Sequence, residues 1–272
     1  MAPTLSQVTD VAHGLWPMSG AEDWDAPGLV VGDPAAGITA IHLAVDAVPD
    51  TADEALERGA QLLIVHHPLL LRGVTTVAED RYKGAVIARL IRGGCGLLAA
   101  HTNADVVADG TSAVLARRLG LREVRPIAPS AADAELGLGR VGELPDAVTL
   151  GELARGLQEV LPATAQGIRG AGDYFARVRR VALCAGAGDS LLTHPAVRGA
   201  DVYITSDLRH HPASEARENA RLSGGPALLD ISHWAAEWLW LEVAAGALRE
   251  ALPGVTITVS ELRTDPWDFA LV

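Results

Sequence analysis

The chain has 272 residues, of which 49% are hydrophobic and 21% are charged, and its formal net charge at pH 7 is −12. This composition predicts a soluble globular protein of one large or two medium domains, and the acidic balance argues against nucleic-acid binding through a basic face. No basic and apolar leader is found at the N-terminus and no apolar run reaches about 18 residues, so we expect no membrane span and a cytoplasmic location.

Short apolar runs alternate with helical patterns along the first 120 residues. Strands are expected at 38–45, 61–65 and 96–100, and helices at 51–59, 82–92 and 111–119. Thr51 is the expected N-cap of the first of these helices, with Glu54 placed for a capping box, and Gly120 closes the last. Continuous apolar strands between helices indicate an α/β fold with a largely parallel sheet that is buried on both faces.

The second half of the chain repeats this pattern. The stretch VALCAGA at 181–187 lies 140 positions after IHLAVDA at 41–47. With the same offset, residues 199–207 align with residues 59–67. The identities are few, so a chance match is the alternative. We predict a duplication, giving two similar three-layer α/β units whose sheets are covered by helices. The Pro/Ala/Gly-rich stretch 125–138 is interpreted as the linker between them.

The two cysteines, Cys95 and Cys184, each lie inside an apolar stretch. We interpret them as buried core thiols rather than as a disulfide or a pair of metal ligands.

Two adjacent histidines, His66 and His67, interrupt the apolar run LLIVHHPLLL directly after an expected strand. Ligands bind at the carboxyl ends of the strands in open α/β sheets, so this position favours a binding role. For an isolated pair, two solvent-exposed loop histidines would be the simpler interpretation. The pair is not isolated, because two further clusters follow other apolar runs.

The next strand ends in HTNAD, which holds His101 and Asp105. A later apolar run leads into SHWAAEWLWLE, where His233 and Glu237 are four residues apart in an expected helix. Side chains at that spacing share one helix face and can converge on a metal ion. A hydrogen-bonded surface pair is the alternative for these last two residues.

Together the three clusters supply six candidate donors: His66, His67, His101, Asp105, His233 and Glu237. A mixed imidazole and carboxylate set suits Zn, Fe, Mn, Ni or Co rather than Ca or Mg alone. Six donors exceed the needs of one tetrahedral ion, so we expect two divalent transition-metal ions per chain, about 3.5–4 Å apart as in typical paired sites.

Two further segments have open interpretations. Asp207, His210 and His211 in ITSDLRHH are either substrate contacts or acid/base groups, or they form a polar strand-to-helix turn in which Pro212 opens the helix. The glycine-rich CAGAGDS at 184–190 is interpreted as a close-packed turn rather than as a phosphate loop, because it lacks the Lys-Ser/Thr of a P-loop.

Six stretches along nearly the whole chain, AEDWDAPGLVVGDP, VHHPLL, AAHTNAD, CAGAGDS, ITSDLRHH and ISHWAAEW, together resemble the NIF-three-like dinuclear metal proteins, often labelled GTP cyclohydrolase type I homologues. The resemblance implies that His66, His67, Asp105, His233 and Glu237 are metal ligands. It implies that His101 is a further ligand or a proton-transfer group.

The resemblance also implies a domain organisation and an assembly. Residues 1–125 would form a first α/β unit with most of the ligands, 126–225 a second unit, and 226–272 a segment that completes the first unit and supplies the last two ligands. The expected assembly is a homohexamer with a central cavity, and the expected partner is a small-molecule substrate, with a nucleotide as one candidate.

The site favours a metal-dependent hydrolase in which a metal-activated water attacks a GTP-like ring carbon, a phosphoester or an amide, with His101 as the proton shuttle. The alternative is a metal-binding or metal-delivery protein, or an assembly scaffold, without turnover of its own. A catalytic centre leaves a coordination position open to water, and a storage site tends to be closed.

Overall fold

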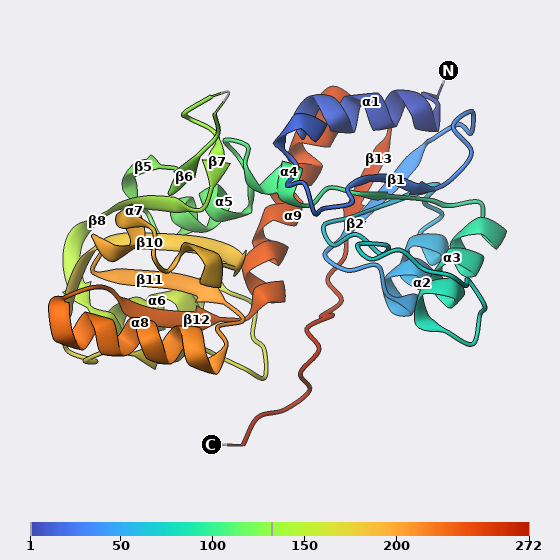
Figure 1. The fold of residues 1–272 in the computed structure, drawn as a ribbon. Coiled ribbons are helices and arrows are strands. Elements are labelled where there is room, and N and C mark those ends of the chain that lie inside the picture. Colours follow the sequence, from blue (N-terminus) through green and yellow to red (C-terminus); the bar gives the residue numbers. More distant parts are fainter. Residues whose placement is uncertain (1, 132, 272) are drawn as a thin grey trace. The chain divides into compact units, whose positions relative to one another are not determined.

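A computed structural model describes residues 2–131 and 133–271 of the chain (Figure 1). The chain forms two compact units, of which the first comprises Met1–Val107 with Leu241–Thr264, and the second Ala108–Trp240 with Asp265–Val272. These boundaries differ from the expected 1–125, 126–225 and 226–272. Residues on both sides of the expected limits hydrogen-bond into the second sheet, as described below. His233 and Glu237 therefore belong to the second unit.

The first unit is built on a five-stranded sheet. Its strands, in spatial order, are β1 (Gly28–Val31), β4 (Gly96–Ala99), β3 (Leu62–Val65), β2 (Ala40–Ala44) and β13 (Thr256–Val259). Strands β2, β3, β4 and β13 run parallel, and β1 runs antiparallel to β4. The expected strands at 38–45, 61–65 and 96–100 are confirmed to within a few residues.

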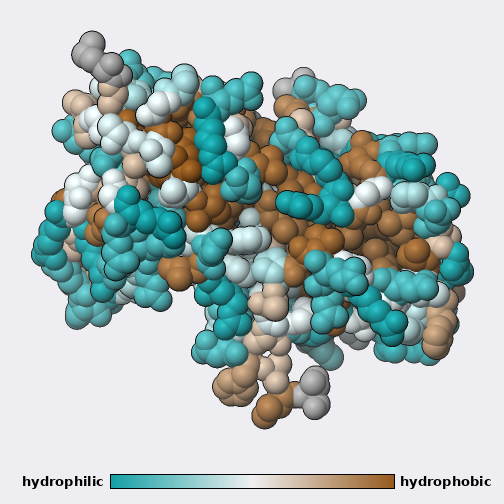
Figure 2. All heavy atoms as spheres, turned by 180° about the vertical axis from the view of Figure 1, so that it is seen from behind, coloured by the Kyte–Doolittle hydropathy of each residue, from teal (hydrophilic) through white to brown (hydrophobic). Residues whose placement is uncertain are grey.

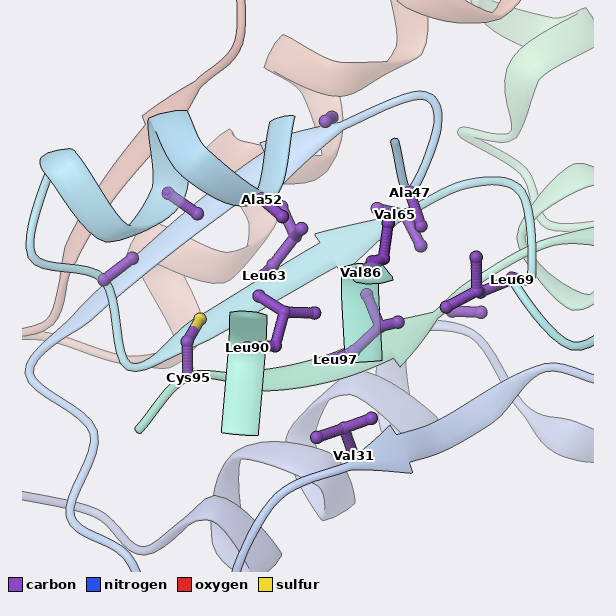
Figure 3. Close-up of a cluster of buried hydrophobic side chains, with 14 residues drawn as sticks. Val31, Ala47, Ala52, Leu63, Val65, Leu69, Val86, Leu90, Cys95 and Leu97 are labelled. Carbon is purple, nitrogen blue, oxygen red and sulfur yellow. The ribbon is translucent and has the colours of Figure 1, made fainter. Parts of the chain in front are cut away.

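Helices cover this sheet. They are α1 (Leu5–Leu15), η1 (Met18–Gly20), α2 (Pro49–Glu57), α3 (Tyr82–Arg92), α4 (Thr102–Asp105) and the second part of α9 (His233–Ala251). Figure 3 shows one packed face, where Leu63 of β3 and Leu97 of β4 point toward Val86 and Leu90 of α3. Cys95 lies in the same buried cluster with a free thiol, as expected from its apolar neighbours.

Helix α2 begins two residues before its expected start. Pro49 occupies the first helical position, where its fixed φ and missing N–H cost nothing. Thr51 is the third residue of the helix and not its N-cap: its hydroxyl accepts the Val48 N–H at 3.1 Å and donates to the Asp46 carbonyl at 2.7 Å. Glu54 forms no capping box and instead joins a polar network in the first unit.

The second unit contains a six-stranded mixed sheet. Its strands, in spatial order, are β5 (Arg122–Arg125), β8 (Arg140–Thr149), β10 (Arg177–Ala187), β11 (Val202–Ser206), β12 (Ala227–Ile231) and β9 (Arg169–Ala171). Strands β10, β11 and β12 are parallel, and β8 and β9 run antiparallel to β10 and β12. Its helices are α5 (Thr111–Arg118), α6 (Leu150–Val160), η2 (Asp189–Leu191), α7 (Pro195–Arg198) and α8 (His210–Ser223).

The stretch 125–138 is not a linker. Strand β5 pairs with β8 at the edge of the second sheet, and β6 (Ala128–Pro129) pairs with β7 (Gly137–Leu138) in a short antiparallel ladder. Gly137 within this stretch and Gly139 just after it have positive φ, +147° and +61°, which glycine adopts without strain.

Strand pairing in the two sheets follows the 140-residue offset between the two halves of the sequence. In the first sheet Ile41 pairs with Leu62 and Leu43 with Ile64. In the second sheet Val181 pairs with Val202 and Leu183 with Ile204, which are the same pairs shifted by 140. Both sheets thus contain the order antiparallel edge, then three parallel strands, as β1-β4-β3-β2 and β9-β12-β11-β10.

Among residues 2–131 and 133–271, no helix combines the length and the apolar composition that crossing a bilayer requires.

Candidate metal centre

Three histidines meet at the carboxyl edge of the first sheet. His66 and His67 directly follow β3, and His101 follows β4. Backbone bonds from the His66 and His67 N–H groups to the carbonyls of Ala44 and Val45 continue the β2–β3 ladder and fix where the side chains leave the sheet. The ring centroids lie 5.1 Å (His66–His67), 5.1 Å (His66–His101) and 5.6 Å (His67–His101) apart, and one nitrogen of each ring lies within 4.8 Å of the others.

Oxygen acceptors fix the ring orientation of His66 and His67. Nδ1 of His66 lies 2.8 Å from the Ala100 carbonyl, and Nδ1 of His67 lies 2.7 Å from Oδ1 of Asp46. A carbonyl only accepts, so Nδ1 of His66 carries the hydrogen and Nε2 holds the lone pair. The Asp46 carboxylate favours the same tautomer of His67. This is the arrangement in which an outer oxygen orients a metal-binding imidazole.

His101 has a more elaborate carboxylate partner in Asp25. Oδ1 of Asp25 accepts from Nδ1 of His101 at 2.7 Å and from the Ala26 N–H at 2.7 Å, while Oδ2 accepts from the N–H and the hydroxyl of Thr102. Burial alone would raise the pKa of Asp25, but the hydrogen bonds from His101 and Thr102 outweigh it and lower the pKa to about 2. Asp25 is therefore a permanent anion that holds His101 with Nε2 as its lone-pair atom.

Asp25 and Asp46 were not among the expected site residues. Asp46 follows the apolar strand β2, so an acidic residue at a strand end was the available signal. Asp25 lies before β1, and only the antiparallel pairing of Gly28 with Ala99 brings it to the carboxyl edge of the parallel strands. Thr264, after β13, donates to the second oxygen of Asp46 at 2.5 Å.

Asp105 lies at the end of α4, close to His66. Its Oδ1 is 3.7 Å from Nε2 of His66, which is too long for a hydrogen bond. Two donors bound at about 2.1 Å to one tetrahedral ion are about 3.4 Å apart. The spacing of these two donors, and their imidazole and carboxylate chemistry, therefore fit a transition-metal ligand set.

The second unit contains an imidazole held by two carboxylates. Ser232 caps α9 by accepting the Ala235 N–H at 3.2 Å, so that His233 lies in the first turn. Nδ1 of His233 is 2.7 Å from Oδ2 of Asp207 and Nε2 is 2.9 Å from Oε1 of Glu237. Burial would lower the pKa of His233, but the charges of Glu237 and Asp207 and their hydrogen bonds raise it well above its usual value. A metal bound at Nε2 would displace a proton.

Gly186 leaves the space that this pair occupies. A Cβ atom at this position would lie 2.6 Å from Oε1 of Glu237 and 3.3 Å from Nε2 of His233, and the backbone has φ +87°. The glycine-rich stretch 184–190 is close-packed, as expected, but it forms the end of β10 and the start of η2 rather than a turn alone. At Gly186 its packing partner is the candidate ligand pair.

Two other expected candidates lie elsewhere. His210 and His211 are exposed on the first turn of α8, with ring centroids 5.3 Å apart, and neither lies in a described metal-compatible group. For Asp207 both interpretations were open, and its carboxylate accepts from His233. The expectation that all six donors serve one pair of ions stays a prediction.

The chain is similar to curated proteins over nearly its whole length. The chain is 49% identical over 271 residues to a protein of Streptomyces coelicolor named GTP cyclohydrolase 1 type 2 homolog, covering 97% of this chain and 94% of that protein. A homologue of the same name from Clostridium perfringens is 33% identical, covering 97% of this chain and 99% of that protein.

Solved structures show the same fold. A Bacillus cereus protein related to NIF3 superposes with a TM-score of 0.90 at 22% identity, covering 99% of this chain and all of that one. A hypothetical protein of Staphylococcus aureus superposes with a TM-score of 0.89 at 25% identity, with the same coverage. The family described as Duf34/NIF3 (NGG1p interacting factor 3) matches residues 3–266, and the chain belongs to this family.

Proposed function

We propose that the protein is a hydrolase that depends on two divalent transition-metal ions, drawn from Zn, Fe, Mn, Ni and Co. The observation that carries the proposal is a shared feature of four histidines: His66, His67, His101 and His233 each have Nδ1 within 2.8 Å of an oxygen. Such outer oxygens orient Nε2 toward a metal and raise its basicity. The names of the curated relatives, as GTP cyclohydrolase homologues, point to the same class.

The exposure of two histidines supports turnover rather than storage. The side chains of His67 and His233 are each 27% exposed, whereas His66 is fully buried. A structural or storage site tends to be closed by protein ligands, and a catalytic site keeps a position that water can reach. Bound at such a site, a divalent metal lowers the pKa of a bound water to about 7 and polarises an oxygen of the substrate.

The residues of the chain have separate roles in this proposal. Asp105, His66 and His67 in the first unit and His233 and Glu237 in the second would hold the metal ions. His101 would move a proton at Nε2, because Asp25 holds Nδ1 and fixes the tautomer of the ring, as an aspartate does for a general-base histidine. The expected homohexamer and the small-molecule, nucleotide-like substrate are kept as parts of the proposal.

Metal content tests the proposal directly. The full chain, purified without chelator or histidine tag, would be measured by inductively coupled plasma mass spectrometry beside His66→Ala, Glu237→Ala and His210→Ala. GTP and p-nitrophenyl phosphate turnover would be assayed on the same samples. We expect about two ions per chain in the wild type and in His210→Ala, which changes an exposed histidine outside the clusters, and loss of metal and turnover in the other two.

The outcomes separate the two candidate functions. Two ions without turnover of any substrate would favour a metal-binding or metal-delivery protein. A wild type that holds no metal even after reconstitution would exclude both functions. Loss of metal in His210→Ala as well would show that the effect is not specific to the clusters.

A further inference from the structure

We infer that Trp24 is a substrate contact, an aromatic platform on which a planar heteroaromatic ring stacks beside His101. This inference rests on the proposed function, since it names a substrate class for the same site. The surface of the protein has hydrophobic areas between hydrophilic ones (Figure 2). Independently of that view, the large side chain of Trp24 is exposed, with 60% of its surface accessible.

Hydrogen bonds anchor the turn that carries this exposed ring. Trp24 is a central residue of a turn that the Asp25 N–H closes onto the Glu22 carbonyl at 2.9 Å. The Glu22 N–H donates to the Thr102 hydroxyl at 3.0 Å, and the Asp25 carboxylate accepts from Thr102 and His101. Both ends of the turn are thus anchored to residues shortly after β4, namely His101 and Thr102.

The anchored turn places the indole against a site histidine. The ring centroids of Trp24 and His101 lie 5.9 Å apart with an interplanar angle of 80°, an edge-on contact. This contact leaves most of the indole accessible. An exposed aromatic ring on an anchored turn next to a candidate catalytic histidine has the geometry of a binding contact, because an aromatic side chain has few torsions to order when a ligand arrives.

The charges of the turn narrow the class of ligand. Glu22 and Asp23 adjoin Trp24 in sequence, so the turn carries acidic residues, while the third acid, Asp25, is buried against His101. An acidic turn repels a free anion and accepts a neutral ring, whose π-face stacks on an indole whatever its exact substituents. The ligand expected from these features is a neutral planar heterocycle, and phosphate groups on it require the balancing charge of the metals.

The test uses the zinc-loaded full chain and two probes, inosine and ribose. Binding would be followed by saturation-transfer difference NMR and by quenching of tryptophan fluorescence, with zinc content measured on every sample. We expect inosine to bind and ribose to give no signal. Trp24→Ala should weaken inosine binding by about tenfold or more, whereas Trp24→Phe keeps the affinity within about threefold but loses the quenching.

A matched control is available in Trp267, which is also 60% exposed but lies in the C-terminal segment of the second unit. Trp267→Ala should leave inosine binding unchanged. Normal zinc content with equal inosine affinity in the wild type and Trp24→Ala would overturn the role of Trp24 and leave the metal proposal intact. Inosine that fails to bind the zinc-loaded wild type at millimolar concentration would overturn it too.

Two further outcomes are decisive. A change in assembly mass in Trp24→Ala, measured by light scattering, would show that the indole is covered by a second copy and would overturn the inference. Absence of zinc from the reconstituted wild type would overturn the proposed function and, with it, a substrate role for Trp24.

Discussion

The carboxyl edges of the two sheets occupy equivalent places in a duplicated fold but carry different side chains. Asp46 follows β2 of the first sheet, and the residue 140 positions later, at the end of β10, is Gly186. His67 follows β3, and its equivalent after β11 is Asp207. Each edge nevertheless forms an imidazole–carboxylate pair with a separation of 2.7 Å: His67 with Asp46, and His233 with Asp207.

The two units take the imidazole and the carboxylate of the pair from different elements. In the first unit the middle strand supplies the imidazole and its neighbour supplies the carboxylate. In the second unit the middle strand supplies the carboxylate, Asp207, and the imidazole comes from helix α9 after the next strand. In both units an imidazole and a carboxylate therefore meet at the carboxyl edge of the sheet. The units differ in which element supplies the imidazole and which supplies the carboxylate.

Gly186→Ala is expected to have the largest effect on metal binding and stability. It disrupts the His233–Glu237 pair at the carboxyl edge of the second sheet, where the two units differ most. The added Cβ would overlap Glu237 and would sit on a backbone with φ +87°. We expect loss of metal and a lower unfolding free energy, by about 1–3 kcal/mol for overpacking, measured by metal analysis and urea denaturation.

The control for that substitution is Gly167→Ala in the same unit. Gly167 also has a positive φ, +60°, but its added Cβ would meet no atom within 4 Å. This variant should lose about 1 kcal/mol of stability from backbone strain alone and keep its metal. Equal metal loss in both variants would show that strain, and not the space beside Glu237, matters.

The carboxylates that contact Nδ1 of His67 and His233 can be replaced by amides. This tests whether both imidazole–carboxylate pairs strengthen metal binding. We expect Asp46→Asn in the first unit and Asp207→Asn in the second each to weaken metal binding by about 10–100-fold, as outer partners of metal-bound histidines do. Competition with a chromophoric chelator would measure the affinity. Asp109→Asn, which removes only a surface ion pair with Arg117, should change nothing. Unchanged affinity in Asp207→Asn alone would mean that only the first unit uses the arrangement.

A buried polar network distinguishes the interior of the first sheet from that of the second. His42 in β2 is fully buried, with Nε2 3.0 Å from Oε2 of Glu54, which also accepts from the Ser260 hydroxyl at 2.6 Å. Its equivalent in β10 is the buried Ala182. Burial lowers the pKa of His42. For Glu54 burial acts to raise the pKa, but hydrogen bonds from Ser260, His42 and Arg58 outweigh it and lower it.

Both shifts make the first unit sensitive to acid. The unfolded chain takes up a proton at His42 near pH 6.5, and at Glu54 near pH 4.5, before the folded protein does. The contribution of these two groups to folding stability is therefore complete above about pH 6.5 and falls as the pH decreases. Hydrogen exchange at pH 4.5 should show β2 and α2 opening before β10. Glu54→Gln should cost about 1–3 kcal/mol at pH 7 and flatten the acid slope; an unchanged slope would contradict the assignment.

The thiols are expected to show the smallest effect. Burial raises the pKa of Cys95 to about 11, and the thiol of Cys184 is buried in the second unit. Neither should react with 5,5′-dithiobis(2-nitrobenzoate) at pH 8 in the folded protein, and both should react in urea, since the thiolate is the reactive form. Rapid labelling of the folded chain would show that one of the units opens readily.

Periodicity and spacing in the sequence determined much of the fold and part of the site. Apolar runs of four to five residues became buried strands, and Tyr82–Arg92 formed a helix with the expected bounds. The four-residue spacing of His233 and Glu237 placed both on one helix face, with Nε2 of His233 2.9 Å from Oε1 of Glu237. These features are local, because strand and helix periods act on neighbouring residues.

Only the tertiary structure decided which residues complete the site and where the units end. Asp25 is 76 positions from His101, and the two meet because β1 runs antiparallel to β4 and returns the chain to the same edge. Strands β5 and β12 pair within the second sheet. The second unit therefore begins before residue 126 and extends past residue 225. Strand order and direction are set by backbone pairing and by burial of the whole sheet, and residues far apart in sequence share in both.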